Sequence, residues 1–297
     1  MKERRLVDSV VEQIVAPALY VVATPIGNLS DISQRALHIL RGVDLIDAED
    51  TRHSSRLLDH YGIGTSMISL HEHNEQQRSE ELIERLQQGI SIALISDAGT
   101  PLISDPGYLL VSQVRKAGFR IIPIPGACAV ITALSAAGLP TDHFLFVGFS
   151  PSKSGPRKKF FQRYSQQAET LVFYESPKRL QASLRGLIEV IGGDRPVAIA
   201  RELTKMHETI LQQPVAELLE SLQADPVQFR GEIVVLVGGV SRQEVSGLDE
   251  KMEQLLALLI NELPVTRAAQ VVAQISDVPK RQVYQRALAL QEIRDQS

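Results

Sequence analysis

Residues Ser96 to Gly107 read Ser-Asp-Ala-Gly-Thr-Pro-Leu-Ile-Ser-Asp-Pro-Gly and directly follow the apolar run Ile90 to Ile95. A short, continuous apolar run of this kind is typical of a strand buried within a parallel sheet. The loop after it concentrates backbone amides, two carboxylates and three hydroxyls. Because open parallel sheets bind ligands outside the carboxyl ends of their strands, the sequence predicts a small-molecule site at this loop.

The same arrangement occurs three more times in the first half of the chain. Apolar runs lead into loops of small or charged residues, at 19–23 before 24–28, 43–48 before 49–53, and 120–124 before 125–129. Segments with helical periodicity lie between the runs, at 34–40, 79–88 and 108–117. This alternation predicts an α/β domain with a parallel sheet, over residues 1–143, whose loops converge on one edge.

A second α/β domain is predicted over residues 144–241. Strand 144–149 opens it, and further strands are expected at 170–174, 197–200, 209–211 and 232–237, with shorter and less regular spacing that favours a mixed sheet. The segment 150–159 is rich in Pro, Gly, Ser and basic residues, which predicts a mobile loop or linker near the domain boundary.

The last segment, 242–297, is predicted to be helical. Helices are expected at 249–261, at 267–275 with Thr266 as its cap, and at 280–290. Two short helices joined by a tight turn resemble a helix-turn-helix, although a helical cap or a dimerisation arm fits the spacing equally well. The fold class is therefore two α/β domains plus a small helical C-terminal segment.

Composition limits the classes of function. The 297 residues are 44% hydrophobic and carry a net charge of -4, so a polyanion must meet a local basic patch. Cys128 is the single cysteine, which excludes an internal disulfide and a cysteine-based metal cluster. His71 and His73 have no third partner nearby, and no metal is predicted. No apolar run reaches membrane-spanning length, so we expect a soluble, cytoplasmic protein.

Five segments carry candidate chemistry. The loop 24–28 fits neither the dinucleotide fingerprint nor the Walker loop, so it is either a tight turn or a ligand loop. Segment 49–53 can orient a hydroxyl or a cationic ligand, or cap the next helix with Asp50 or Thr51. The strand ends at 173–179 and 200–205 combine acids and bases, either as surface ion pairs or as the far wall of a cleft. The basic segment 153–159 lies where it can grip phosphates.

Together these segments resemble the tetrapyrrole-methylase superfamily, and within it the cytidine 2'-O-methyltransferases of small-subunit (16S) ribosomal RNA. The matching stretches occur in order, at 23–29, 48–53, 70–74, 96–107, 125–126, 138–142, 173–177 and 200–205. Two positions depart from the family pattern, which often has Pro at the place of Ala23 and Pro-Gly-Pro where this chain has Pro125-Gly126-Ala127.

The resemblance implies S-adenosylmethionine bound between two α/β domains, a homodimer, no membrane, and 16S rRNA or the small ribosomal subunit as partner. It places the cofactor against Thr24, Pro25, Gly27, Asn28, Asp97, Ala98, Gly99, Thr100, Gly126, Cys128, Ala129 and Tyr174. We expect the catalytic groups among Glu49, Asp50, Glu175, Glu202 and Lys205. For RNA binding we expect Arg52, Lys153, Arg157, Lys158, Lys159, Lys178 and Arg201.

The expected activity is methyl transfer to a cytidine 2'-hydroxyl. The alternative on the same scaffold is C-methylation of a tetrapyrrole precursor. A third hypothesis, from another class, is a DNA-binding regulator that uses the helix-turn-helix-like tail. A nicotinamide-dependent oxidoreductase fits poorly because the dinucleotide fingerprint is missing.

Overall fold

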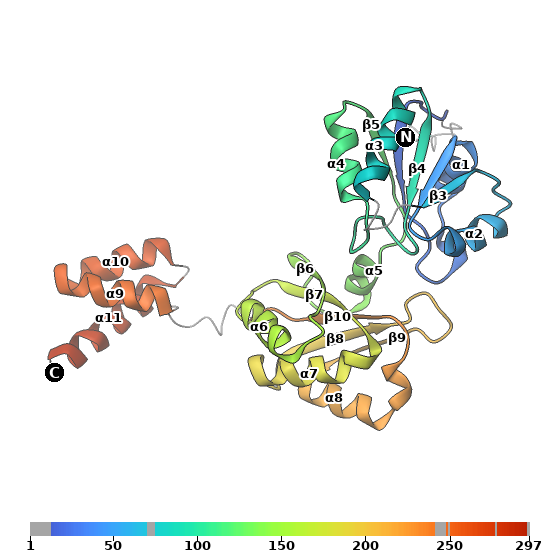
Figure 1. The fold of residues 1–297 in the computed structure, drawn as a ribbon. Helices are drawn as coiled ribbons and strands as arrows, with labels where there is room; N and C mark the ends of the chain where they lie inside the picture. Colours follow the sequence, from blue (N-terminus) through green and yellow to red (C-terminus); the bar gives the residue numbers. More distant parts are fainter. Residues whose placement is uncertain (1–12, 70–74, 241–247, 249, 277, 296–297) are drawn as a thin grey trace, which may run out of the picture.

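The structure is a computed structural model that describes residues 13–69, 75–240, 248, 250–276 and 278–295 (Figure 1). The first domain contains β1 (Ala18–Val22), η1 (Leu29–Asp31), α1 (Gln34–Gly42), β2 (Leu45–Ala48), α2 (Thr51–His60), β3 (Met67–Ser69), α3 (Glu75–Gln87), β4 (Ser91–Ile95), α4 (Tyr108–Lys116), β5 (Arg120–Ile124) and α5 (Ala129–Ala136). The second contains β6 (Phe144–Phe149), α6 (Ser154–Tyr164), β7 (Thr170–Glu175), α7 (Pro177–Ile191), β8 (Pro196–Arg201), β9 (Thr209–Pro214), α8 (Val215–Ala224), η2 (Pro226–Phe229) and β10 (Ile233–Val237). Helices α9 (Glu250–Glu262), α10 (Val265–Ile275) and α11 (Lys280–Asp295) follow.

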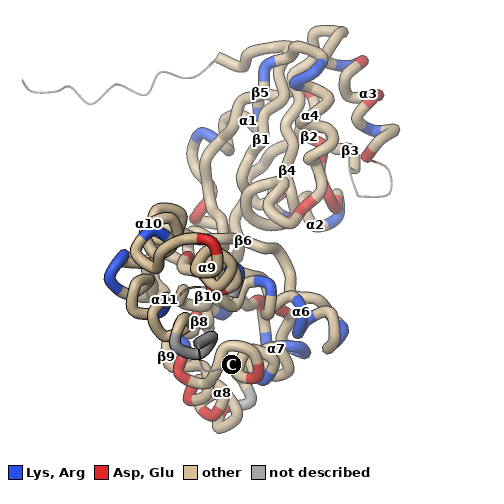
Figure 2. The backbone as a smooth tube through the Cα atoms, turned by 90° about the vertical axis from the view of Figure 1, so that its left-hand side faces the viewer, with Lys and Arg blue, Asp and Glu red and all other residues tan. Residues whose placement is uncertain are grey.

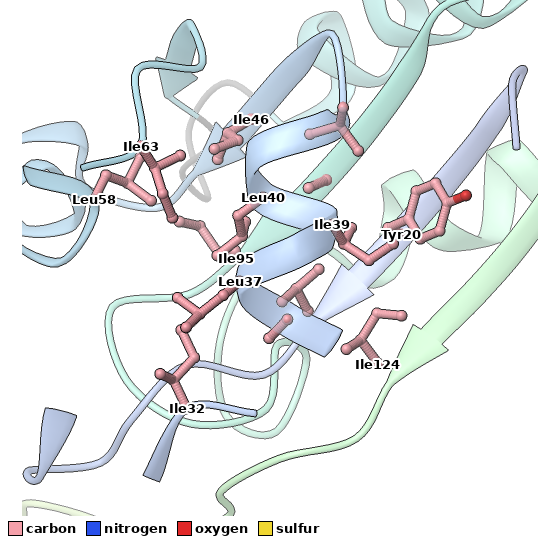
Figure 3. Close-up of a cluster of buried hydrophobic side chains, with 14 of the residues drawn as sticks. Tyr20, Ile32, Leu37, Ile39, Leu40, Ile46, Leu58, Ile63, Ile95 and Ile124 are labelled. Atoms are coloured by element: carbon pink, nitrogen blue, oxygen red, sulfur yellow. The ribbon is translucent and has the colours of Figure 1, made fainter. Parts of the chain in front are cut away.

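The first sheet is parallel throughout and has the strand order β3-β2-β4-β1-β5. Alternate side chains of its strands face opposite sides. Tyr20 lies beside Ile39 of α1 (Figure 3), in a cluster that also includes Leu58 of α2, whereas the neighbouring Leu19 belongs to the cluster formed with α3 and α4. The predicted parallel α/β domain is confirmed. Strand β3 was not predicted, because three residues are too short to show a hydrophobic pattern.

The second sheet is mixed, as predicted, with the order β6-β7-β10-β8-β9 and a parallel pair only between β6 and β7. Helices α6, α7 and α8 cover one face with Phe161, Leu184 and Leu218. Helix α5 covers the other face, where Val130 and Ala133 meet side chains of β7, β8 and β10. The sequence assigns α5 to the first domain, but its packing joins it to the second sheet.

The expectation of a mobile loop over 150–159 is wrong from Ser154 onward, where α6 begins. Pro156 lies in the first helical turn, where a backbone N–H has no partner inside the helix, so it does not interrupt α6. Phe161 then anchors the helix in the core, with 1% of its surface exposed. Turn-forming composition predicted the wrong structure because packing of the aromatic residues further along the helix outweighs it.

Helices α9, α10 and α11 share a small core of their own, which includes Leu256, Val272 and Val283. Figure 1 shows them apart from the two sheets. The predicted helices are present, but the cap assigned to Thr266 is wrong: α10 starts at Val265, two residues before the predicted start, and Pro264 occupies the cap position. Among the helices of the described residues, none has the length and apolarity that crossing a bilayer requires.

The end of β10 provides a test of the fold. A Cβ on Gly239 would overlap the carbonyl oxygen of Ala168, and the next residue, Val240, donates its N–H to Gln167 at 2.8 Å. We therefore expect Gly239→Ala to lower the free energy of unfolding by about 1–3 kcal/mol, the usual cost of overpacking. Urea unfolding measures this. Gly64→Ala is the control, because a Cβ there meets nothing within 4 Å. Equal stability of the two variants would contradict this packing.

Candidate active site

Three loops of the first domain are fixed to one another at the carboxyl edge of the parallel sheet. Thr24 and Gly99 exchange backbone hydrogen bonds, at 2.8 and 3.1 Å, which joins the loop after β1 to the loop after β4. The hydroxyl of Thr100 donates to the carbonyl of Ala127 at 3.0 Å, which adds the loop after β5. The predicted convergence of these loops is confirmed.

Two glycines permit this close approach. Gly99 has a φ of 85°, a conformation that side chains disfavour, and a Cβ there would lie 3.2 Å from the Ile26 side chain. A Cβ on Gly126 would lie 2.9 Å from the Cβ of Ala23. Ala23 and Gly126 are therefore packed as a pair of small residues beneath the site.

The loops carry a cluster of carboxylates. The backbone N–H of Asp50 donates to Asp97 at 3.1 Å, and the N–H of Asp97 donates to Glu49 at 3.4 Å. Burial, together with the charges of Asp105, Asp97 and Asp50, raises the pKa of Glu49. Burial and the charge of Asp97 likewise raise the pKa of Asp105. A bound cation would relieve this repulsion.

A cavity of about 410 Å³ lies between the domains beside this cluster. We call it the acidic cavity; its lining includes Glu49, Asp97, Ala98, Ile103, Asp105, Ala129, Phe149, Tyr174 and Glu232. Burial, with Cys128 and Asp105 nearby, raises the pKa of Tyr174, so its phenol is neutral. The volume is within the range of small-ligand sites.

A second cavity, of about 460 Å³, lies against the loop after β1. We call it the mixed cavity; its lining includes Thr24, Pro25, Gly27, His53, Arg56, Lys205 and Glu232. Ile26, Asp97, Ala98 and Glu232 line both cavities, which are therefore neighbours. The predicted cofactor residues thus divide. Ala129 and Tyr174 line the acidic cavity, Thr24, Pro25 and Gly27 line the mixed one, and Asp97 and Ala98 line both. The other predicted cofactor residues line neither cavity; they are Asn28, Gly99, Thr100, Gly126 and Cys128.

The turn after β8 closes on the loop after β1 and joins the two domains. The N–H of Asn28 donates to the Thr204 hydroxyl at 3.1 Å, and the stem of Lys205 packs on Gly27. Thr204 has a φ of 65°, so the turn is held in an unfavourable conformation. We call Gly27, Asn28, Thr204 and Lys205 the interdomain clasp.

Lys205 also links two acids of the second domain. Its Nζ lies 3.0 Å from Glu202 and 3.1 Å from Glu232. Although partial burial opposes it, these carboxylates raise the pKa of Lys205, which therefore remains charged. Glu202 further accepts the backbone N–H of Glu232 at 2.9 Å, so its role in the structure is to hold this turn.

Two other predicted catalytic residues have structural partners. Asp50 caps α2 by accepting the N–H of Arg52 at 2.8 Å, the capping role that the sequence allowed. Glu175 is fully buried and accepts hydrogen bonds from Ser150, Ser183 and the Ser176 N–H, and from Arg179 at 2.9 Å. The carboxylate oxygens of Glu175 are therefore already occupied. Among the predicted catalytic acids this leaves Glu49 as the candidate base, because its carboxylate lines the acidic cavity and its pKa is raised.

The predicted RNA-binding residues fall into two groups. Arg52, Lys153, Lys158, Lys159 and Lys178 are exposed. Arg157 and Arg201 are buried, with 7% and 6% of their surface exposed. Arg157 reaches the carbonyl of Ser152 at 3.3 Å and Arg201 the carbonyl of His207 at 3.0 Å, so both guanidinium groups stabilise turns instead of facing an RNA.

Several residues that line the acidic cavity were not among the predicted site residues, including Ile103, Asp105, Phe149 and Glu232. The first two lie in the loop after β4, and their place in that loop was the available signal. Phe149 and Glu232 flank strand ends of the second sheet, and nothing in the sequence marks them. Among described residues no group of three metal-ligating side chains occurs. His71 and His73 lie outside the described residues.

Comparisons with known proteins agree with this architecture. The family described as Tetrapyrrole (Corrin/Porphyrin) Methylases matches residues 18–219, and the RsmI C-terminal HTH domain matches residues 246–291. The chain is 51% identical to Ribosomal RNA small subunit methyltransferase I of Vibrio cholerae, over 91% of this chain and 93% of the relative. It is 52% identical to the protein of the same name from Escherichia coli O157:H7, over 92% and 95%.

Solved structures share the fold at low identity. The uroporphyrin-III-C-methyltransferase from Thermus thermophilus aligns with a TM-score of 0.54 and 19% identity, over 74% of this chain and 94% of that one. The methyltransferase CobJ aligns with a TM-score of 0.56 and 20% identity, over 75% and 94%.

The interdomain clasp can be tested directly. A Cβ on Gly27 would lie 2.6 Å from Cγ of Lys205 and 2.9 Å from the Thr204 hydroxyl, so Gly27→Val must displace the turn after β8. Because both cavities have walls from the two domains, we expect S-adenosylmethionine to bind at least ~10-fold more weakly, about 1.4 kcal/mol. Calorimetric titration measures this, with Gly64→Val as the control. Unchanged affinity would show that the clasp does not shape the site.

Proposed function

Since this chain belongs to the tetrapyrrole methylase family and is a methyltransferase that uses S-adenosylmethionine, we propose that its acceptor is the ribose 2'-hydroxyl of a cytidine in 16S ribosomal RNA. The observation that carries this proposal is the extent of the similarity. The relatives named Ribosomal RNA small subunit methyltransferase I match at 51–52% identity through both α/β domains and the C-terminal helices.

The acidic cavity fits the methyl donor. When bound, S-adenosylmethionine supplies an electrophilic methyl group on a cationic sulfur. Glu49, Asp97 and Asp105 surround the cavity with negative charge, which favours a cation there. Gly99 and Gly126 keep the backbone of the adjoining loops close to the cavity. The residues present therefore fit the donor.

The mixed cavity fits the acceptor side. His53, Arg56 and Lys205 contribute basic groups there, whereas the acidic cavity carries mainly carboxylates. An RNA phosphate is attracted by the basic groups of the mixed cavity and repelled by the carboxylates of the acidic cavity. We infer that the acceptor nucleotide enters through the mixed cavity and meets the donor where Asp97 and Ala98 line both cavities.

Glu49 is suited to take the proton of the ribose hydroxyl. A hydroxyl is a weak nucleophile at neutral pH, so its alignment and the removal of its proton both accelerate methyl transfer. Burial and the neighbouring acids raise the pKa of Glu49, which makes its carboxylate a stronger base than an exposed glutamate. Glu49 would take the proton of the hydroxyl as the oxygen bonds to the methyl carbon. The carbon–sulfur bond of the donor would break in the same step and leave its electron pair on a neutral thioether sulfur. Lys205, which Glu202 and Glu232 hold in place, positions the acceptor nucleotide in the mixed cavity.

The acceptor proposal has two corollaries. An rRNA acceptor implies a cytoplasmic protein whose partner is 16S rRNA or the small ribosomal subunit. A homodimer is proposed on the resemblance to the family, and its test is the mass of the protein in solution.

Mapping of ribose methylation tests the proposed acceptor. We expect purified protein with S-adenosylmethionine to add one methyl group to 16S rRNA from cells that lack the protein, located on a cytidine ribose by mass spectrometry of nuclease fragments. Gly99→Val is the inactive control, because its φ of 85° and the nearby Ile26 exclude the larger side chain. Methylation of a base, or of a tetrapyrrole precursor alone, would refute the proposal.

The role of Glu49 predicts a pH dependence. The active form is the carboxylate, so kcat/KM should fall as pH decreases through the pKa of Glu49, which lies above that of an ordinary glutamate. We expect Glu49→Gln to reduce kcat by roughly 10²–10⁴-fold and to abolish this fall of kcat/KM at low pH, the acid limb of the pH profile. Rates measured against pH, with S-adenosylmethionine affinity measured in parallel, decide the role. An unaltered acid limb in Glu49→Gln would exclude Glu49 as the base.

A further inference from the structure

The basic residues of the second domain concentrate on α6 and α7. In a chain of net charge -4, the segment 153–185 contains few acids, Glu169 and Glu175, and Glu175 is buried. Figure 2 shows the blue segments of α6 and α7 on the same side of this domain. The exposed members are Lys153, Lys158, Lys159, Arg163, Lys178 and Arg185.

A groove of about 470 Å³ lies between these two helices. Its charged and polar lining consists of Ser154, Arg157, Lys158, Gln181, Arg185 and Glu189. Gly155, Ala182 and Gly186 line it as well, and a Cβ on Gly155 would meet nothing within 4 Å. Small residues thus keep the groove open between its basic walls. We call it the α6–α7 groove.

The groove and the acidic cavity both border α7. Ser176 and Pro177 line that cavity, and α7 begins at Pro177. Lys178, Gln181 and Arg185 follow at spacings of three and four residues, which places them on one face of the helix. Arg185 therefore lies about 10 Å along α7 from Lys178, at 1.5 Å per residue.

The groove presents groups that suit phosphates. The Lys153 side chain makes no capping hydrogen bond to α6, so the N–H groups of Ser154 and Gly155 at its start are open to an anion; Pro156 has no N–H, and the N–H of Arg157 donates to Lys153. Lys158 pairs with Glu189 at 3.3 Å, but both side chains are more than half exposed, at 52% and 61%. Exposed pairs of this kind are weak, and a phosphate can take the place of Glu189.

We propose that the α6–α7 groove binds the sugar-phosphate backbone of the substrate RNA beside the nucleotide that enters the cleft. Lys158 and Arg185 contact phosphates, Gln181 contacts phosphate or sugar oxygens, and Glu189 competes with the RNA for Lys158. This inference rests on the proposed function, since it assigns a second contact surface to the same RNA. It adds Gln181, Arg185 and Glu189 to the residues that meet the substrate.

The test compares the salt dependence of binding to purified 16S rRNA. We expect Lys158→Ala with Arg185→Ala to reduce affinity at least ~10-fold and to lower the slope of log K against log salt by about 1.4–1.8, since each lost phosphate contact removes roughly 0.7–0.9. Glu189→Gln should instead bind more tightly, because it frees Lys158. A merely destabilised protein would not show this gain.

Lys116→Ala, an exposed residue at the end of α4, is the matched control, and S-adenosylmethionine affinity should be the same in all variants. A double variant that keeps the wild-type salt slope would overturn the proposal that the α6–α7 groove binds RNA. A loss of affinity seen only with assembled small subunits would overturn it as well, because it would indicate a protein partner. Wild-type protein that binds neither RNA nor subunits refutes the proposed function itself, so the two failures are distinguishable.

Discussion

The site depends on the reciprocal backbone hydrogen bonds between Thr24 and Gly99. They join the loops after β1 and β4, which arise 75 residues apart in the sequence, and Thr100 adds the loop after β5 through Ala127. Because these contacts involve mainly backbone groups and glycine, they leave side chains free to line cavities. The carboxylates of Glu49, Asp97 and Asp105 can then crowd together at a cost in electrostatic repulsion that a cationic ligand offsets.

The second domain completes the site from the opposite side. Its mixed sheet is covered by helices on both faces, and α5 supplies the face toward the first domain. The interdomain clasp adds a direct hydrogen bond and a close packing contact at Gly27. The charges then separate by location: carboxylates gather at the acidic cavity, and exposed basic groups gather on α6 and α7. A cationic donor and a polyanionic acceptor are thereby favoured at different places on one protein.

Much of this arrangement could be predicted from the sequence. Continuous apolar runs followed by loops of small and charged residues predicted the parallel sheet and the meeting of its loops, because both follow from local patterns. The helix at Ser154 and the burial of Arg157 and Arg201 could not be predicted, since each depends on how the folded chain packs. Phe161 anchors α6 in the core, and the turns before α6 and β9 fold back so that Arg157 and Arg201 reach their carbonyls. Phe149 and Glu232 were missed for the same reason, because only the packing of the two domains brings them to the acidic cavity.

The attachment of α5 has a mechanical consequence. The helix packs with the second sheet, yet it follows β5 of the first sheet after only the short segment 125–128. Any rotation of one domain against the other must bend the chain there, directly behind the wall that receives the donor. The stiffness of these four residues therefore limits how freely the two halves of the protein can swing apart around a bound donor.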